Sequence, residues 1–383
     1  MLEKFKNFGY ASFVATLVLV AFGTVAIYSA GHARDPIFHG MWKANLATAA
    51  FAFAIYFAAA FFDYRAILKW LSVPAYAASV VFLVAVLFLG SEIYGGRRWL
   101  WFFQPSEVAK LSAIMLFAWM LGRGGSRGFG LFAAAAALAA LPFALILAEP
   151  DLGTALALVP ALVAMMLAAD VWRRGLVTCL ALASVAALLL LGAVYEAERP
   201  GVSQRTRENI LRFVPLKSHQ IRRVRTFLYP ETDPLGDGYT LRQAKISIGS
   251  GGFSGKGIGK GETNSLKFLP PSVSMNDFIF CVWAEETGFL GSAALLALYA
   301  VVCLSGVWTA FTAADLQGRL LALGVSTLVF AHVAINTAMS VGMMPITGLP
   351  LPFMSSGRTF LATAIVGLGL VQSVSTNKTK ENE

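Results

Sequence analysis

The stretch "YASFVATLVLVAFGTVAIYSA", residues 10–30, decides the fold class because it carries no charge and is long enough to cross a bilayer. Hydrophobic residues make up 57% of the 383 positions, charged residues make up 13%, and the mean hydropathy is +0.68. A soluble domain is typically about 45–50% apolar and about 25% charged. Further apolar stretches follow the first, so it predicts a membrane anchor rather than a removable signal peptide.

Outward from this stretch, apolar windows predict an all-α, polytopic membrane protein of about ten transmembrane helices. The windows are residues 10–30, 46–62, 71–90, 108–121, 129–148, 152–169, 176–195, 278–308, 320–341 and 359–373. Gly288 predicts a bend in the eighth helix. The chain, residues 1–383, is expected to form one membrane domain, with one large loop over residues 196–277 between helices seven and eight.

Charge predicts the orientation, because cytoplasmic connections carry an excess of Lys and Arg. With the N-terminus inside, the cytoplasmic connections hold 11 Lys and Arg, and the short opposite ones hold 5. Both termini are therefore expected in the cytoplasm, and the large loop outside it. This loop holds 13 Lys and Arg against 8 Asp and Glu, which favours an anionic partner. Without a nucleic-acid motif, a phosphorylated lipid head group fits better than nucleic acid.

The large loop has three recognisable parts. Residues 209–230 have apolar positions at helical spacing, which predicts an amphipathic helix on the membrane surface, and a short helix is expected after it. The glycine run "GSGGFSGKGIGKG" has glycine after both of its lysines, where a P-loop needs Ser or Thr. A flexible hinge is the favoured interpretation, with backbone amides near a phosphate as the alternative. Scattered histidines and cysteines within apolar runs indicate neither a zinc site nor a disulfide.

Several acidic residues lie at or within predicted spans, where charge is costly. Glu107 and Lys110 are three apart on one helix face, which predicts an intrahelical ion pair or a pair facing a cavity. Asp151 follows Glu149 at the start of the sixth helix, either as a helix cap or, secondly, as a substrate contact.

Asp277 precedes the eighth helix and has two interpretations. It could cap the helix, helped by Asn276, or it could act as a general base for a sugar hydroxyl. The second interpretation expects Lys110 beside it if helices four and eight are neighbours, because a nearby cation keeps a partly buried carboxylate ionised. Glu285 and Glu286 lie about 12 Å deeper at about 1.5 Å per residue, which predicts a buried hydrogen-bonded network instead.

The motifs of the chain resemble those of the SEDS family of bacterial cell-wall proteins. They are, in order, "GGRRWL", "QPSEVAK", "EPDLGTAL", "HQIRRV", "TDPLGDGYTLRQAKISIGSGG", "NDFIFCVWAEETGFLG" and "HVAINTAMSVGMMPITGLPLPFMSSG". Within the family, "QAKISIGSGG" favours the RodA branch over the FtsW branch. The resemblance implies a ten-helix glycosyltransferase of the bacterial plasma membrane. Such a protein polymerises lipid II into peptidoglycan for cell elongation and rod shape, releases the polyprenyl diphosphate, and works with a class B penicillin-binding protein.

The resemblance also implies site residues. Asp277 takes the place of the family's essential aspartate, so we expect it to be catalytic. Substrate-binding roles are expected for the other residues on motif positions: Arg98, Glu107, Lys110, Asp151, Gln220 and Arg223. Three of these are cations that could meet the charge of the leaving pyrophosphate, as could a divalent Mg²⁺ or Mn²⁺. No other cofactor is expected.

One motif departs from the family pattern. "SSGRTF" places Arg358 where the family usually has a second glycine, so the loop is expected to differ or to carry strain, and no role is transferred to Ser355 or Ser356.

Two other functions stay open on the sequence alone. A bundle of ten helices with polar residues at membrane depth also describes a lipid II flippase, although no internal inverted repeat is visible. A non-enzymatic scaffold that recruits its partner through helix faces is the third interpretation.

Overall fold

The computed structural model describes residues 2–32, 36–93, 96–101, 103–124, 128–199, 201–214, 218–262, 266 and 268–378. Ten long helices within these ranges match the ten predicted windows, which confirms the all-α, polytopic membrane fold. They are α2 (Tyr10–His32), α3 (Met41–Phe61), α4 (Tyr64–Leu89), α5 (Pro105–Leu121), α6 (Phe129–Ala148), α7 (Leu152–Ala168), α8 (Arg173–Glu198), α14 (Ile279–Phe311), α15 (Leu316–Ser340) and α16 (Arg358–Thr376). Eight of them are long and apolar enough to cross a membrane, while α5 and α7 have 17 residues each.

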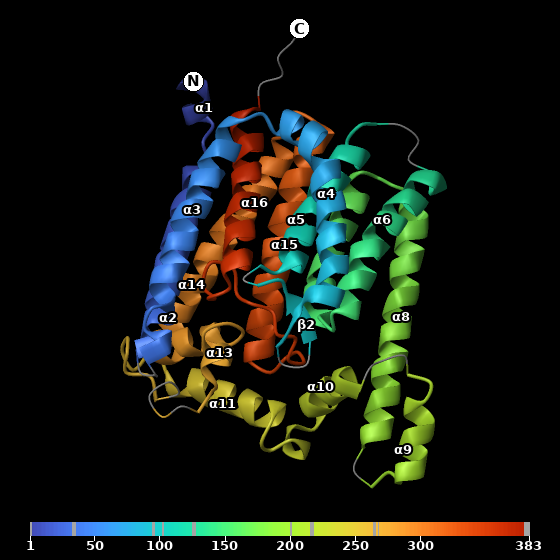
Figure 1. Cartoon of the computed structure of the whole chain (residues 1–383), viewed down its shortest axis with the longest axis vertical. Coiled ribbons are helices and arrows are strands. Elements are labelled where there is room, and N and C mark those ends of the chain that lie inside the picture. Colours follow the sequence, from blue (N-terminus) through green and yellow to red (C-terminus); the bar gives the residue numbers. More distant parts are fainter. Residues whose placement is uncertain are drawn as a thin grey trace.

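The helices run side by side between two ends of the molecule (Figure 1). Both chain termini lie at one end, and the elements of the large loop gather at the other. These elements are α9 (Gln204–Leu211), α10 (Ser218–Leu228), η2 (Pro230–Thr232), α11 (Asp237–Ser250) and α13 (Pro271–Ser274). The two remaining short helices are α1 (Leu2–Lys6) and η1 (Pro36–Phe38). The bundle therefore has a termini end and a loop end.

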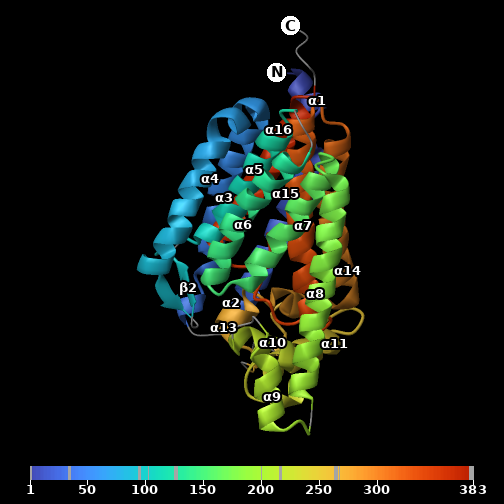
Figure 2. The same ribbon diagram turned by 90° about the vertical axis from the view of Figure 1, so that its right-hand side faces the viewer.

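One β-hairpin lies between α4 and α5. Strand β1 (Ser91–Ile93) pairs antiparallel with β2 (Gly96–Trp99), with Glu92 opposite Arg97. Its second strand carries Arg98 at the loop end of the bundle (Figure 2). The sequence windows did not predict this hairpin.

The bundle core depends on small residues at helix contacts, as expected where lipid supplies no hydrophobic drive between helices. Gly369 of α16 packs directly on α3, and a Cβ at this position would lie 2.8 Å from the Cα of Tyr56. α14 packs in turn on α2 and α15, and α15 packs on α5 and α7. These contacts place α15, which carries the buried His332 and Asn336, against α5, α7 and α14.

The predicted bend in α14 is confirmed at Gly288. Its φ of 65° and ψ of −161° are open to glycine almost alone. The glycine run fills the bend: the amide of Phe289 donates to the Gly252 carbonyl at 2.9 Å, and the amide of Gly257 donates to the Glu286 carbonyl at 2.9 Å. The run is thus bound to both sides of the bend, so the favoured flexible hinge was wrong.

The predicted amphipathic helix over residues 209–230 is two helices. α9 ends at Leu211 and α10 begins at Ser218, while residues 215–217 lie outside the described part of the chain. Pro215 in the connecting segment is a residue that interrupts helices. The short helix expected next is confirmed as α11.

The predicted network around Glu285 and Glu286 is also confirmed. The Glu285 carboxylate accepts hydrogen bonds from Lys256 Nζ at 2.8 Å and from Ser247 Oγ at 3.1 Å. Glu286 accepts one from the Ser29 hydroxyl of α2. The free-energy cost of burying these carboxylates is therefore offset by hydrogen bonds. The same hydrogen bonds join α14 to the glycine run and to α2.

Candidate active site

Asp277 lies at the loop end, in the turn between α13 and α14, and the turn is held by the segment before α16. The Ser355 hydroxyl donates to the Asn276 carbonyl at 2.6 Å, and the Ser356 hydroxyl donates to Asn276 Oδ1 at 2.5 Å. The amide of Ser356 donates to the Met275 carbonyl at 3.1 Å. The two serines that received no role from the sequence therefore fix the backbone beside Asp277.

Strain expected at Arg358 is not found there. Arg358 begins α16 with ordinary helical backbone, and Gly357 before it has a φ of −71°. The left-handed residue in this segment is Phe353, with a φ of 65°. The loop therefore differs from the expected pattern without a strained arginine.

Asn336 of α15 joins the Asp277 turn to the segment after α15. Its side-chain amide donates to the Asp277 carbonyl at 2.7 Å and to the Leu349 carbonyl at 2.6 Å. Asn336 is fully buried, so these bonds do not compete with water. One side chain thus fixes the spacing between the Asp277 backbone and the residues around Gly348.

The carboxylate of Asp277 does not cap α14. The capping position is Phe278, which makes no side-chain cap bond, so the helix-cap interpretation was wrong. Among the described residues, no hydrogen bond reaches this carboxylate, which is half-buried. Its Oδ2 lies 3.5 Å from the position that a Cβ on Gly348 would take, at a φ of +74°. The absence of that Cβ leaves room directly beside the acid.

Arg223 also lies beside this space. It extends from α10, and its Nη1 donates to the Thr347 carbonyl at 3.0 Å. Its Nη2 is 4.0 Å from the same hypothetical Cβ on Gly348. Burial and the charge of Arg98 lower the pKa of Arg223. Because arginine stays protonated at neutral pH, the room beside Gly348 has a cation facing the Asp277 carboxylate.

Arg98 is the second cation of the group. Its Nε donates to the Glu149 carbonyl at 3.2 Å, and its Nη2 donates to the Pro150 carbonyl at 2.5 Å. Its Nη1 lies 4.0 Å from Oδ2 of Asp151. The β-hairpin therefore places a guanidinium against the turn between α6 and α7.

Asp151 caps α7 and also lies near Arg98, while its predicted substrate contact stays a prediction. Its Oδ1 accepts from the amide of Thr154 at 3.1 Å, which confirms the helix cap. Its Oδ2 faces Arg98 and lies 3.5 Å from Nε2 of Gln104. The adjacent Glu149 is fully buried, and neither of its carboxyl oxygens has a hydrogen-bond partner among the described residues. Burial, with the charge of Asp151, raises the pKa of Glu149 to about 9, so this carboxyl is neutral at pH 7.

Burial and the neighbouring charges together set the pKa of Asp277. Burial raises its pKa to about 6, against the lowering effect of Arg223 and with a smaller raising effect from Asp151. At pH 7 the group is therefore mostly ionised, and it is a stronger base than an ordinary aspartate. A carboxylate with these properties and no hydrogen-bond donor of its own can accept a proton from a substrate hydroxyl.

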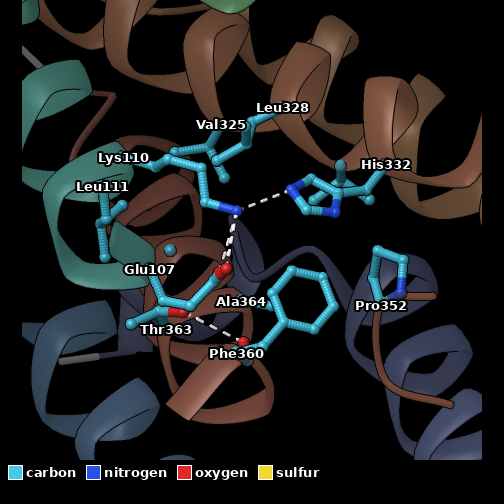
Figure 3. A pocket seen from close by; sticks show the side chains of 12 residues that line it. Glu107, Lys110, Leu111, Val325, Leu328, His332, Pro352, Phe360, Thr363 and Ala364 are labelled. Carbon is cyan, nitrogen blue, oxygen red and sulfur yellow. Dashed lines mark hydrogen bonds and ion pairs between the residues drawn. The ribbon is translucent and has the colours of Figure 1, made fainter. Parts of the chain in front are cut away.

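Lys110 does not have the predicted position beside Asp277. Its Nζ forms an ion pair with Glu107 Oε2 at 2.9 Å and lies 2.8 Å from Nε2 of His332 on α15 (Figure 3). The three side chains are almost completely buried and border a cavity of about 30 Å³, which is about the space of one water molecule. The predicted pair facing a cavity is confirmed, but the cations that act on Asp277 are Arg223 and Arg98.

The protonation of His332 follows from its partners. A lysine ammonium only donates, so Nε2 of His332 accepts and the ring proton lies on Nδ1. Nδ1 faces the Pro350 carbonyl at 3.4 Å. The buried cluster of Glu107, Lys110 and His332 therefore contacts the same segment that carries Gly348, through Pro350.

Gln220 lies on α10, one helical turn before Arg223, and is buried. The predicted substrate contact of Gln220 stays a prediction.

The described residues do not favour a metal centre built by the chain alone. No three His, Cys, Asp or Glu side chains among them converge with metal-ligand spacing. The positive charge near Asp277 comes from guanidinium groups instead. A divalent cation carried by a pyrophosphate substrate would need few protein ligands, so the metal stays a prediction.

Sequence reasoning missed Asn336, His332 and Gly348. All three belong to the quoted stretch "HVAINTAMSVGMMPITGLP", but none was considered singly. The available signal was the spacing of His332 and Asn336, four residues apart and so on one face of an apolar helix. Polar residues at such a place in a membrane helix are usually functional.

Known proteins resemble this chain over most of its length. A family model described as "Cell cycle protein", named for FtsW, RodA and SpoVE, matches residues 10–380. Peptidoglycan glycosyltransferase MrdB of Escherichia coli K12 is 36% identical over 312 residues, which cover 79% of this chain and 77% of MrdB. Peptidoglycan glycosyltransferase RodA of Treponema pallidum is 28% identical over 425 residues, covering 96% of this chain and 98% of that protein.

Solved structures show the same arrangement. A chain from a study of "polymerization and crosslinking by a peptidoglycan synthase complex" superposes with a TM-score of 0.74 at 28% identity, covering 98% of this chain and 99% of that one. The rod shape determining protein RodA of Thermus thermophilus gives a TM-score of 0.67 at 27% identity, and 98% of each chain is covered.

Proposed function

Because the chain belongs to the family of FtsW, RodA and SpoVE proteins, we propose that it polymerises lipid II into glycan strands at the outer face of a bacterial plasma membrane. The chain is a peptidoglycan glycosyltransferase and a multi-pass membrane protein. We assign it to cell elongation and rod shape, with both termini in the cytoplasm. The Lys and Arg distribution and the common end of the two termini support this orientation.

The observation that carries the mechanism is the Asp277 carboxylate, which has no hydrogen-bond partner among the described residues and lies close to Arg223 beside Gly348. Asp277 takes the proton from the acceptor's sugar hydroxyl as that oxygen attacks the anomeric carbon of the donor. The new glycosidic bond forms while the bond to the polyprenyl diphosphate breaks, and the proton stays on Asp277 until solvent removes it. No nucleotide is required, because the reacting bond is already activated by the pyrophosphate.

The leaving pyrophosphate develops negative charge, and two guanidinium groups are available to stabilise it. Arg223 and Arg98 are close enough to Asp277 that both of their charges lower its pKa, and the charge of Arg98 also lowers the pKa of Arg223. Both are held by backbone carbonyls, so little reorganisation is needed as the charge develops. We propose that the pyrophosphate lies between them, and that Mg²⁺ or Mn²⁺ is an additional candidate to neutralise its charge.

An apolar groove beside α8 supports a lipid-linked substrate. It has a volume of about 760 Å³ and lies between α8 and α9, where Leu189, Leu190, Ile210 and Phe213 line it. A polyprenyl chain needs an apolar surface of this kind, and holding it would orient the head group for reaction.

We also propose a class B penicillin-binding protein as the partner. The similar solved chain comes from a peptidoglycan synthase complex, whose description joins polymerisation to crosslinking. A transpeptidase held beside this chain would crosslink the strands that it releases.

The test of the proposed function is incubation of the purified full-length chain with lipid II, without nucleotide. We expect glycan polymer and free polyprenyl diphosphate. A parallel assay follows labelled lipid II in liposomes that contain the protein. Transfer of lipid II between leaflets with no polymer in either assay would favour the flippase and contradict the polymerase.

The pH profile should report the base. Because Asp277 must be ionised to accept a proton and its pKa is raised to about 6, kcat/KM should fall as the pH falls through about 6. Arg223→Gln should move this acid limb to higher pH, because the charge of Arg223 lowers the pKa of Asp277. Arg222→Gln is the matched control, since Arg222 is exposed and pairs with Asp237 instead. An acid limb that stays in place in Arg223→Gln would contradict the assignment.

A further inference from the structure

A groove with polar and apolar lining lies at the termini end, at the opposite end of the bundle from the loop elements around Asp277. It has a volume of about 600 Å³ and runs between the start of α2 and the ends of α14 and α16. The proposed polymerase mechanism makes no use of it. Its lining combines basic, neutral polar and apolar side chains, and none of its lining residues is acidic.

The groove carries two lysines, Lys6 and Lys378, that form no ion pair with any described residue. Lys6 is exposed and Lys378 is half-buried. Burial lowers the pKa of Lys378, which reflects a partly desolvated ammonium without an anion beside it. An anionic ligand would therefore remove an electrostatic cost.

Neutral donors lie deeper in the same groove. Tyr10, Ala11 and Ser12 line it and form the first turn of α2, where backbone amides lack intrahelical partners, although the amide of Tyr10 donates to the Phe8 carbonyl at 2.9 Å. Gln372 of α16 is only 4% exposed, and its Nε2 has no hydrogen-bond partner among the described residues. Its Oε1 accepts from the Tyr56 hydroxyl at 3.3 Å and lies 3.0 Å from the position of a Cβ on Gly9. A buried amide donor is thus present beside the positive end of a helix.

The apolar part of the lining indicates what kind of anion fits. Leu304, Leu368 and Val371 line the groove, and Trp308 beside them is 67% exposed. Tryptophan is enriched where membrane proteins meet the lipid head groups. A ligand that satisfies both parts has an anionic head and acyl chains, and basic pockets between membrane helices bind such lipids.

We propose that this groove binds the head group of an anionic phospholipid, such as phosphatidylglycerol, from the leaflet at the termini end. The phosphate would lie between Lys6 and Lys378, with the amide of Gln372 and the first turn of α2 as further donors. The acyl chains would extend along the apolar surface near Trp308. This site is separate from lipid II polymerisation and does not depend on it.

The experiment measures phosphatidylglycerol bound to the full-length protein by native mass spectrometry after reconstitution in vesicles of phosphatidylglycerol and phosphatidylcholine. The double variant Lys6→Gln, Lys378→Gln should bind phosphatidylglycerol about 30-fold more weakly, from about fivefold for each lysine. Gln372→Leu should also weaken binding. The control is Lys69→Gln, Arg123→Gln, which removes two exposed charges at the same end but outside the groove.

Each result decides between lipid binding at the groove and another explanation. An equal loss in the control pair would indicate general attraction to a negative surface and would overturn the proposal. Equal binding of phosphatidylcholine, or full displacement by inorganic phosphate, would overturn the anionic lipid as ligand. Binding that appears only after deletion of residues 379–383 would mean that the chain's own end occupies the groove. Unchanged polymerisation of lipid II by the lysine pair variant would show that the protein is folded and that the two sites are independent.

Discussion

Asp277→Asn should lower the polymerisation of lipid II by the purified protein by about 100-fold or more, the range in which a general base contributes. Asparagine has nearly the same shape but cannot accept the proton of the acceptor hydroxyl. The substitution should leave the fold intact, because the described contacts of Asp277 are made by its backbone carbonyl with Asn336. The carboxylate itself accepts no hydrogen bond from any described residue and interacts with Arg223 only through charge.

The measurement compares polymer length and amount at equal concentrations of folded protein. Glu231→Gln is the matched control, because Glu231 is an exposed acid of the same large loop, and it should polymerise like the wild type. Activity of Asp277→Asn within about threefold of the wild type would rule out the base, since general-base catalysis contributes far more than this. A non-enzymatic scaffold would give that result.

Lys110→Met should destabilise the fold by about 3–5 kcal/mol, because it leaves Glu107 buried without its ion partner. Thermal unfolding in detergent would show this as a lower midpoint than that of Lys43→Met, which removes an exposed lysine. Surface charges of that kind contribute about 0–1 kcal/mol. The segment with Gly348 should also loosen, because His332 would lose its contact with Nζ.

The second variant distinguishes structural support from direct substrate binding. Adding Glu107→Gln to Lys110→Met removes the uncompensated charge, so a substantial part of the lost stability should return. If Lys110 instead contacts substrate, the double variant would regain stability but not polymerisation. Full stability of Lys110→Met alone would contradict the buried ion pair as a structural support.

The ten helices could be predicted from the sequence because a membrane span is encoded locally, in about 20 apolar residues. Asp277 stood out for a related reason, since an acid next to an apolar run is visible without any tertiary contact. Its cation was misassigned because helix adjacency is not local: Lys110 turned out to face His332 of α15. The cation near Asp277 is instead Arg223, which comes 54 positions earlier in the chain and lies beside Gly348.

The glycine run and Asn336 illustrate the same limit. A glycine-rich segment has the same composition whether it moves freely or packs on a helix, and only the bend at Gly288 shows that it packs. Asn336 has no distinguishing local pattern beyond its polarity, because both of its partners are backbone carbonyls. Backbone acceptors are the same for every residue type, so sequence patterns do not reveal them.

The two hydrogen bonds donated by the Asn336 side chain have an evolutionary consequence. Since the amide of Asn336 ties the Asp277 carbonyl to the Leu349 carbonyl from within the bundle, parts of the large loop that do not carry Arg223 can acquire insertions or altered charge without changing this distance. Relatives could thus diversify in the proteins they recruit while their chemistry stays constant. A substitution at position 336 would not have this freedom, because it would alter the spacing in every such variant.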